Sequence, residues 1–153
     1  MIFSGLARGA LAGAAGTTAL NAATYADMSW RARSASTMPQ QAVTVLAERA
    51  GHPVPGQGEV RENRLAGLGS LSGIATGVGI GAVAGVLAPM LRRVPFLLAA
   101  LAFGGGAMAA TDLSMLKLGL TDPAQWSPTD WLSDAVPHLA YGVVSAAALR
   151  SLH

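Results

Sequence analysis

The chain alternates between long hydrophobic segments and shorter polar ones. The hydrophobic segments cover residues 2–26, 65–89, 94–117 and 129–149, and most of the polar residues gather in the segment 27–64. A helix needs about 20 predominantly apolar residues to cross a bilayer, and each of these segments has that length. We therefore predict an all-α integral membrane protein, a single domain over residues 1–153 with four transmembrane helices.

Glycines recur at every fourth position in two of these segments. The stretch 65–91 has 27 residues and no charge, and its repeat falls at Gly69, Gly73, Gly77, Gly81 and Gly85. In the first segment the repeat falls at Gly5, Gly9 and Gly13. This spacing places the glycines along one face of a helix, where another helix can approach closely. Both faces are predicted to be packing surfaces, against each other or against a partner.

The polar segment 27–64 is the one extramembrane segment of any size. Within it, residues 40–50 are predicted to form a short helix that begins after Thr37 and ends at Gly51. Such a helix can lie on the membrane surface or pack against its own protein. Its weak amphipathicity favours packing against its own protein.

Composition agrees with a membrane protein and excludes several other classes. Hydrophobic residues make up 52% of the chain and charged residues 12%, which is unusual for a soluble domain. The absence of cysteine excludes disulfides, thiolate metal sites and thiol nucleophiles. The net charge of +2 is spread over scattered basic residues, which argues against nucleic-acid binding. The first segment also has features of a signal peptide, but it is longer than the usual hydrophobic region of one.

Four crossings place both chain termini on the same side of the membrane. That side carries Arg8, Arg92, Arg93 and Arg150 and no acid, whereas all eight acids lie on the other side. Because short basic loops without acids tend to stay inside, the termini are predicted to lie in the cytoplasm and the protein in the plasma or inner membrane. Trp126 and Trp131 are predicted to belong to an interfacial aromatic belt.

The same topology brings polar residues together at the end opposite the termini. The candidates are Asn21, Arg64, Asp112, Asp134, His138 and Tyr141. Ionisable groups inside a membrane are usually paired, so Asp112 is predicted to pair with Arg64 and Asp134 with His138. The favoured interpretation is a structural hydrogen-bond cluster, and the alternatives are a site for protons or a cationic or polar substrate, or a metal site.

No motif fixes a reaction or a cofactor. The serines lack a nucleophile elbow, and the glycine run 77–81 follows no strand, so it is not a phosphate loop. We therefore expect a non-catalytic accessory or stabilising subunit of a larger membrane transport or cell-envelope complex, or a homo-oligomer. The alternatives are a small transporter or channel that uses Asp112, Asp134 and His138, and an intramembrane enzyme with Asp134 and His138 as acid and base.

Overall fold

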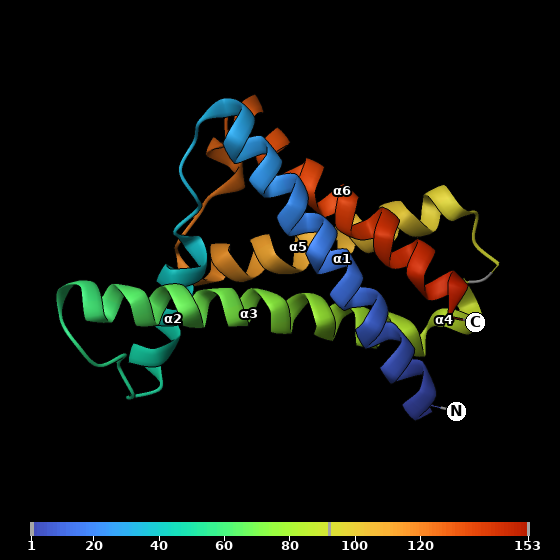
Figure 1. Ribbon diagram of the computed structural model, residues 1–153, viewed down its shortest axis with the longest axis horizontal. Coiled ribbons are helices and arrows are strands. Elements are labelled where there is room, and N and C mark those ends of the chain that lie inside the picture. The colour runs from blue at the N-terminus through green and yellow to red at the C-terminus, as the bar shows by residue number, and fades with distance from the viewer. Residues whose placement is uncertain (1, 92, 153) are drawn as a thin grey trace.

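The computed structural model describes residues 2–91 and 93–152, and every regular element among them is helical (Figure 1). Four long helices are joined by short elements and turns. They are α1 (Ile2–Arg31), α3 (Gly58–Val86), α5 (Phe96–Leu118) and α6 (Pro128–Ser151). The short elements are α2 (Met38–Arg49), α4 (Ala88–Leu91) and the 3-10 turn η1 (Pro123–Gln125).

The long helices form an up-and-down bundle that is open along one seam. Helix α1 packs between α3 and α6, and α6 packs between α1 and α5. Helices α3 and α5, by contrast, meet over only a small area, although α4 and the turn after it connect them directly in the chain. Both chain ends lie at the same end of the bundle (Figure 1), as an even number of antiparallel helices requires.

The contact between α1 and α3 is made by the two glycine repeats. A Cβ atom on Gly13 would lie 2.6 Å from the carbonyl oxygen of Gly77, and a Cβ on Gly81 would lie 2.5 Å from the Cα of Gly13. Gly9 and Gly85 likewise meet backbone atoms of the opposite helix. The two backbones are therefore too close for any side chain between them, because real Cβ contacts are longer than these distances.

Helices α5 and α6 use a second close contact of the same kind. A Cβ on Gly104 would lie 2.6 Å from the carbonyl oxygen of His138, and a Cβ on Gly142 would lie 2.6 Å from the amide nitrogen of Gly104. At the far end of α6, the Arg150 guanidinium lies 5.2 Å from the Phe96 ring centroid and donates a hydrogen bond of 2.6 Å to the Val94 carbonyl oxygen.

The prediction of four transmembrane helices is supported for two of them. By length and composition, α3 and α5 are apolar enough to cross a membrane, whereas α1 and α6 are not. Helix α1 is rich in glycine, alanine and threonine and carries Arg8, while α6 carries Asp134, Pro137 and His138. These residues lower the mean hydropathy of α1 and α6 below that of α3 and α5, which are the two outer helices of the bundle.

Two helices also extend further into the polar segment than predicted. Helix α1 continues to Arg31, because Asp27 and Arg31 form an ion pair one helical turn apart. Helix α3 begins at Gly58 rather than near residue 65, and Glu59 in its first turn suits the positive end of the helix dipole. The connection between α1 and α3 is correspondingly shorter, and it contains α2, which packs on α3 with Pro39 and Gln40 against Gly69.

The glycines of α3 allow a matched test of the α1–α3 contact. Gly81→Leu should lower the free energy of unfolding in detergent by about 2 kcal/mol or more, because the new side chain overlaps the backbone of α1. Gly73→Leu is the control, since a Cβ there meets nothing within 4 Å. Equal thermal stability of the two variants would show that the contact does not form.

Candidate functional site

The predicted polar residues are brought together in part, between α5 and α6. The Nδ1 atom of His138 lies 3.3 Å from Oδ1 of Asp134 and 2.9 Å from the backbone oxygen of the same residue. The Nε2 atom of His138 faces the Thr111 hydroxyl at 3.4 Å. The Asp112 carboxyl interacts electrostatically with Asp134 and His138. Asp112, Asp134 and His138, which we call the carboxylate–histidine cluster, therefore form one network.

This cluster is largely enclosed by the two helices. The His138 side chain is 11% exposed and that of Asp134 is 27% exposed, and Asp112 is also half-buried. Oδ2 of Asp134 is buried and has no hydrogen-bond donor among the described residues. Burial of a carboxylate oxygen without a hydrogen-bond donor raises the free energy of the folded state. Oδ2 of Asp134 is therefore an energetically unfavourable atom of the cluster.

Three other predicted polar residues lie outside this network. Arg64 donates a hydrogen bond of 2.9 Å to the carbonyl oxygen of Pro55, so the predicted pairing of Asp112 with Arg64 is wrong. Asn21 is half-buried on α1 and makes none of the described side-chain hydrogen bonds. Tyr141 is buried in the bundle, where its ring lies against Gly16 and its hydroxyl donates to the Gly77 carbonyl oxygen at 2.8 Å. Tyr141 thus links α6 to α3 past α1.

The glycine positions are distributed over three environments. Six of them lie in the contact between α1 and α3, namely Gly5, Gly9, Gly13, Gly77, Gly81 and Gly85. Gly69 packs on α2, and Gly73 faces open space. The two glycine faces therefore occupy each other in this arrangement, and a partner that docks on the bundle would need another surface.

Such a surface is present at the open seam. A groove of about 540 Å³ runs between α3 and α5. Its walls carry small and branched apolar side chains and glycines, among them Ala75, Gly79, Val83, Ala102, Gly106 and Ala110. Sequence reasoning missed this groove, because it depends on which pair of neighbouring helices stays apart.

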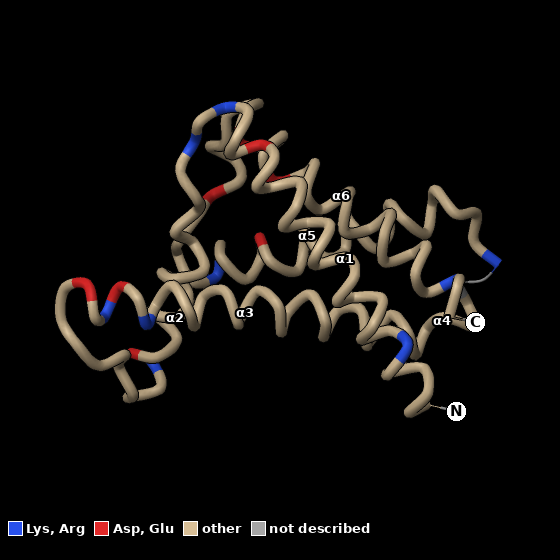
Figure 2. The backbone as a smooth tube through the Cα atoms, in the orientation of Figure 1, with Lys and Arg blue, Asp and Glu red and all other residues tan. Residues whose placement is uncertain are grey.

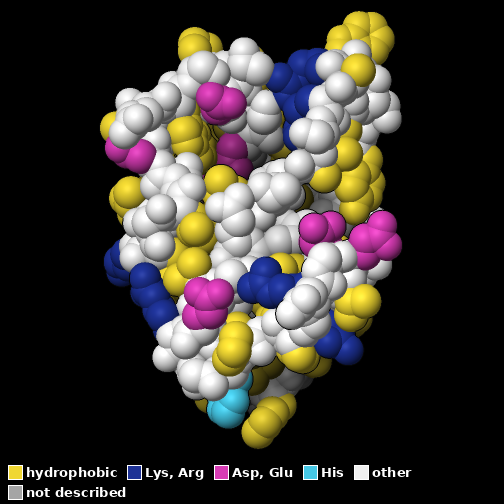
Figure 3. All heavy atoms as spheres, turned by 90° about the vertical axis from the view of Figure 1, so that its left-hand side faces the viewer, with side chains coloured by type: hydrophobic (Ala, Val, Ile, Leu, Met, Phe, Trp, Pro, Cys, Tyr) yellow, Lys and Arg dark blue, Asp and Glu magenta, His cyan; other side chains and the backbone are white. Residues whose placement is uncertain are grey.

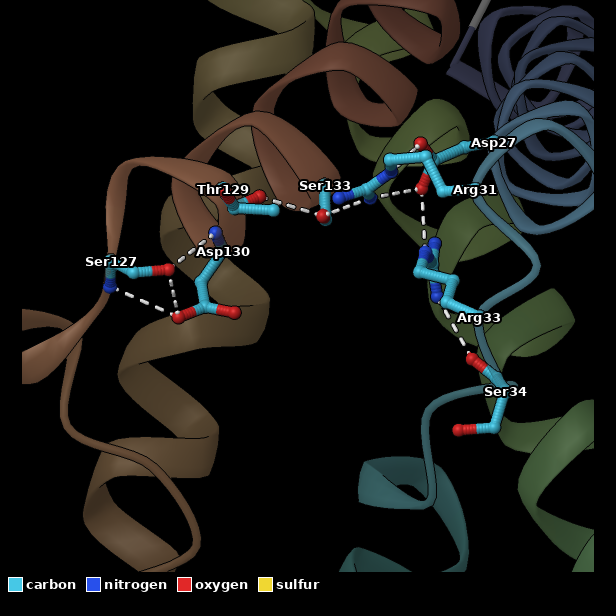
Figure 4. Close-up of polar contacts among 8 residues, drawn as sticks. All are labelled: Asp27, Arg31, Arg33, Ser34, Ser127, Thr129, Asp130 and Ser133. Carbon is cyan, nitrogen blue, oxygen red and sulfur yellow. Dashed lines mark hydrogen bonds and ion pairs between the residues drawn. The ribbon is translucent and has the colours of Figure 1, made fainter.

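A polar clamp joins the end of α1 to the start of α6 (Figure 4). Arg31 donates two hydrogen bonds of 2.5 Å to the carboxylate of Asp27 and a third to the Ser133 hydroxyl. Arg33 adds a further hydrogen bond of 2.6 Å to Asp27. These two guanidinium groups lower the pKa of Asp27 to about 2. The four-residue spacing of Asp27 and Arg31 is the sequence signal that identifies half of this clamp.

Charge is distributed as predicted from the topology. The end of the molecule that bears both termini shows basic but no acidic residues among those described, and the acidic residues lie elsewhere (Figure 2). The basic residues of that end include Arg8, Arg93 and Arg150, while Arg92 lies outside the described residues. The opposite end shows acidic and basic side chains interspersed with hydrophobic ones (Figure 3).

The site holds no arrangement that identifies a known chemistry. Across residues 2–91 and 93–152, no group of three or more His, Cys, Asp or Glu side chains is placed to hold a metal ion. Comparisons with protein-family models, with curated proteins and with solved structures each returned no match. A functional proposal for this chain therefore rests on its own geometry.

The clamp should open in acid. A carboxyl whose pKa is lowered on folding stabilises the fold above its ordinary pKa of about 4, and this contribution is lost as the pH falls toward about 2. The chain has no cysteine, so spin labels can be placed on Ser29→Cys and Leu132→Cys alone. The distance distribution between them should be narrow at neutral pH and broaden between about pH 4 and pH 2.

The same labels on Asp27→Asn provide the control. This variant should show the broad distribution at every pH, because its amide cannot neutralise Arg31 and Arg33. A narrow distribution in the variant, or one that persists in the unaltered chain at pH 2, would contradict the role given to Asp27.

Proposed function

We propose that the protein is an integral membrane protein whose four long helices all cross the bilayer, with their charged ends in the polar segment 27–64 outside it and with the termini in the cytoplasm. Helices α3 and α5 support this placement, because their most apolar stretches are only 17% and 28% buried. The core helix of a soluble protein would be mostly buried. Helices α1 and α6 would then enter the bilayer as packing partners of these two.

Exposed side chains on the outer helices agree with lipid contact. Large hydrophobic residues outside the groove are half exposed or more on both of them, including Leu71 on α3 and Leu97, Leu98 and Leu113 on α5. Contiguous exposed apolar surface marks a membrane or protein contact in folded chains. The basic residues at the terminal end suit the cytoplasmic headgroups.

Within that placement, we propose that the protein is a non-catalytic accessory subunit of a larger membrane transport or cell-envelope complex. The groove between α3 and α5 is the observation that carries this proposal. Its glycines and alanines allow a helix backbone to approach on either wall, and helices associate in lipid through such small residues. The expected occupant is an apolar transmembrane helix of the partner.

Two glycines let the groove be filled without disturbing the bundle. A Cβ on Gly79 or on Gly106 meets nothing within 4 Å, and both residues line the groove. The double variant Gly79→Leu and Gly106→Leu should therefore fold normally and lose the partner when the tagged chain is extracted in mild detergent. We expect the yield of co-purified partner to fall at least tenfold, which corresponds to about 1.4 kcal/mol of binding free energy.

Gly105→Leu is the matched control. Gly105 is the neighbour of Gly106 on α5, its Cβ also meets nothing within 4 Å, and it does not line the groove. The control should retain the partner in a fixed ratio. Equal retention by the groove variant and the control would contradict the groove as the docking site, and an unaltered chain that purifies without any partner would contradict the accessory role.

The carboxylate–histidine cluster favours a second function, a small transporter or channel with a polar site at one membrane face. The network contains three ionisable side chains from α5 and α6. Placing ionisable groups inside a membrane costs free energy, and such groups are often functional. In liposomes, Asp134→Asn and His138→Ala should each abolish the flux of protons, Na⁺ or K⁺ that the unaltered chain supports. Flux that persists in both variants would refute these assignments.

A further inference from the structure

The end of the bundle that bears both termini has a basic surface without acidic partners. Arg93 lies in the turn before α5, and Arg150 lies in the last turn of α6. Arg8 is on α1, one residue before Gly9, which meets the backbone of Gly85 near the end of α3. Among the described residues no acid lies at this end (Figure 2). The three arginines, which we call the terminal basic surface, therefore need a negative partner from outside the chain.

The guanidinium group of Arg150 is held at a fixed place on this surface. It lies 5.2 Å from the Phe96 ring centroid and donates a hydrogen bond of 2.6 Å to the Val94 carbonyl oxygen. A guanidinium group has five N–H donors, so most of those of Arg150 are left for a ligand, and the side chain is exposed. The planar fork of donors matches two oxygens of one phosphate group.

Arg93 adds a second positive charge at the same turn. It directly precedes Val94, whose carbonyl oxygen binds Arg150. Its side chain is exposed, and it takes part in none of the hydrogen bonds or ion pairs of the described residues. A negatively charged group bound at this turn would interact with both arginines and offset the repulsion between them.

The apolar surface beside these arginines suits a lipid better than a free anion. Phe3 near the start of α1 is 87% exposed, and Leu97 and Leu98, which follow Phe96 on α5, are 65% and 56% exposed. Leu101 continues this exposed surface one turn further along α5. A phospholipid has a phosphate group directly above its hydrocarbon chains, and this order matches a guanidinium group followed by exposed leucines.

We infer that the terminal basic surface binds the headgroup of an anionic phospholipid, with the phosphate on Arg93 and Arg150 and the acyl chains along the first turns of α5. Arg8 adds positive charge from α1. Charge complementarity favours an anionic headgroup over a zwitterionic one. The ammonium group of a zwitterionic lipid would lie among arginines, with no acid of the described residues at this end to pair with it.

This inference rests on the proposed membrane placement and names the lipid that contacts the terminal end. It does not depend on the groove or on a protein partner. Resistance of the chain to extraction from its membranes by alkaline carbonate tests the placement by itself. Release by carbonate would overturn both proposals, whereas retention without a lipid preference would overturn the lipid site alone.

The test is binding of fluorescent phosphatidylglycerol or phosphatidylcholine to the tagged full chain, immobilised in mild detergent. The unaltered chain should retain at least tenfold more of the anionic lipid. Arg93→Gln should lower this preference several-fold without a change in thermal stability, because Arg93 makes no described side-chain contact within the protein. Arg93→Gln combined with Arg150→Gln should abolish the preference.

Arg49→Gln is the control, because Arg49 is exposed at the end of α2 and its replacement removes the same charge from the opposite end of the molecule. It should retain the preference. The inference is overturned if the unaltered chain binds both lipids equally, or if Arg93→Gln and the double variant keep the preference. It is also overturned if Arg49→Gln lowers the preference as much as Arg93→Gln, or if excess inorganic phosphate at constant ionic strength displaces the lipid, since the site would then take a free anion.

Discussion

The close approach of α1 to α3 is the contact on which the rest of the arrangement depends. The two backbones meet through Gly9, Gly13, Gly81 and Gly85, with no side chain between them. In the proposed membrane placement, helices gain little from hydrophobic burial against each other, so close backbone packing would supply much of the attraction. The same contact orients α1 so that its opposite side, at Gly16, accepts the Tyr141 ring of α6. One interface of glycines thus determines how three of the four long helices lie.

The open seam follows from this arrangement. Helix α3 uses the glycines that face α1, and α5 uses Gly104 for α6. The small residues that α3 and α5 direct at the seam are therefore left without a helix packed against them. A groove of about 540 Å³ is left between the two most apolar helices of the chain. The groove of the proposed accessory role and the carboxylate–histidine cluster occupy different parts of the bundle, the first at this seam and the second between α5 and α6.

The helical class of the fold could be predicted from the sequence, since the hydrophobic segments are long and are separated by clear polar stretches. The four-residue repeat of Gly77, Gly81 and Gly85 could be recognised as a packing face, but the repeat alone does not identify the helix that covers it. Gly73 belongs to the same repeat and yet faces open space, because α1 crosses α3 nearer the C-terminal end of α3, at Gly77, Gly81 and Gly85. Which positions of a periodic face are used depends on the crossing point, and this is a tertiary property.

The candidate site shows the same limit. The pair of Asp134 and His138 could be predicted, because residues four apart on a helix are neighbours. The rule that opposite charges pair predicts Asp112 with Arg64, whereas Arg64 binds the carbonyl oxygen of Pro55 in the loop before α3, and Asp112 interacts electrostatically with Asp134 and His138.

The central claim, that a protein partner fills the α3–α5 seam in the membrane, is tested most directly by photo-cross-linking in intact cells from a photoreactive residue at Gly79. The account predicts one major protein adduct from Gly79 and none from the equivalent probe at Gly105. Adducts with lipid alone at both positions would contradict it.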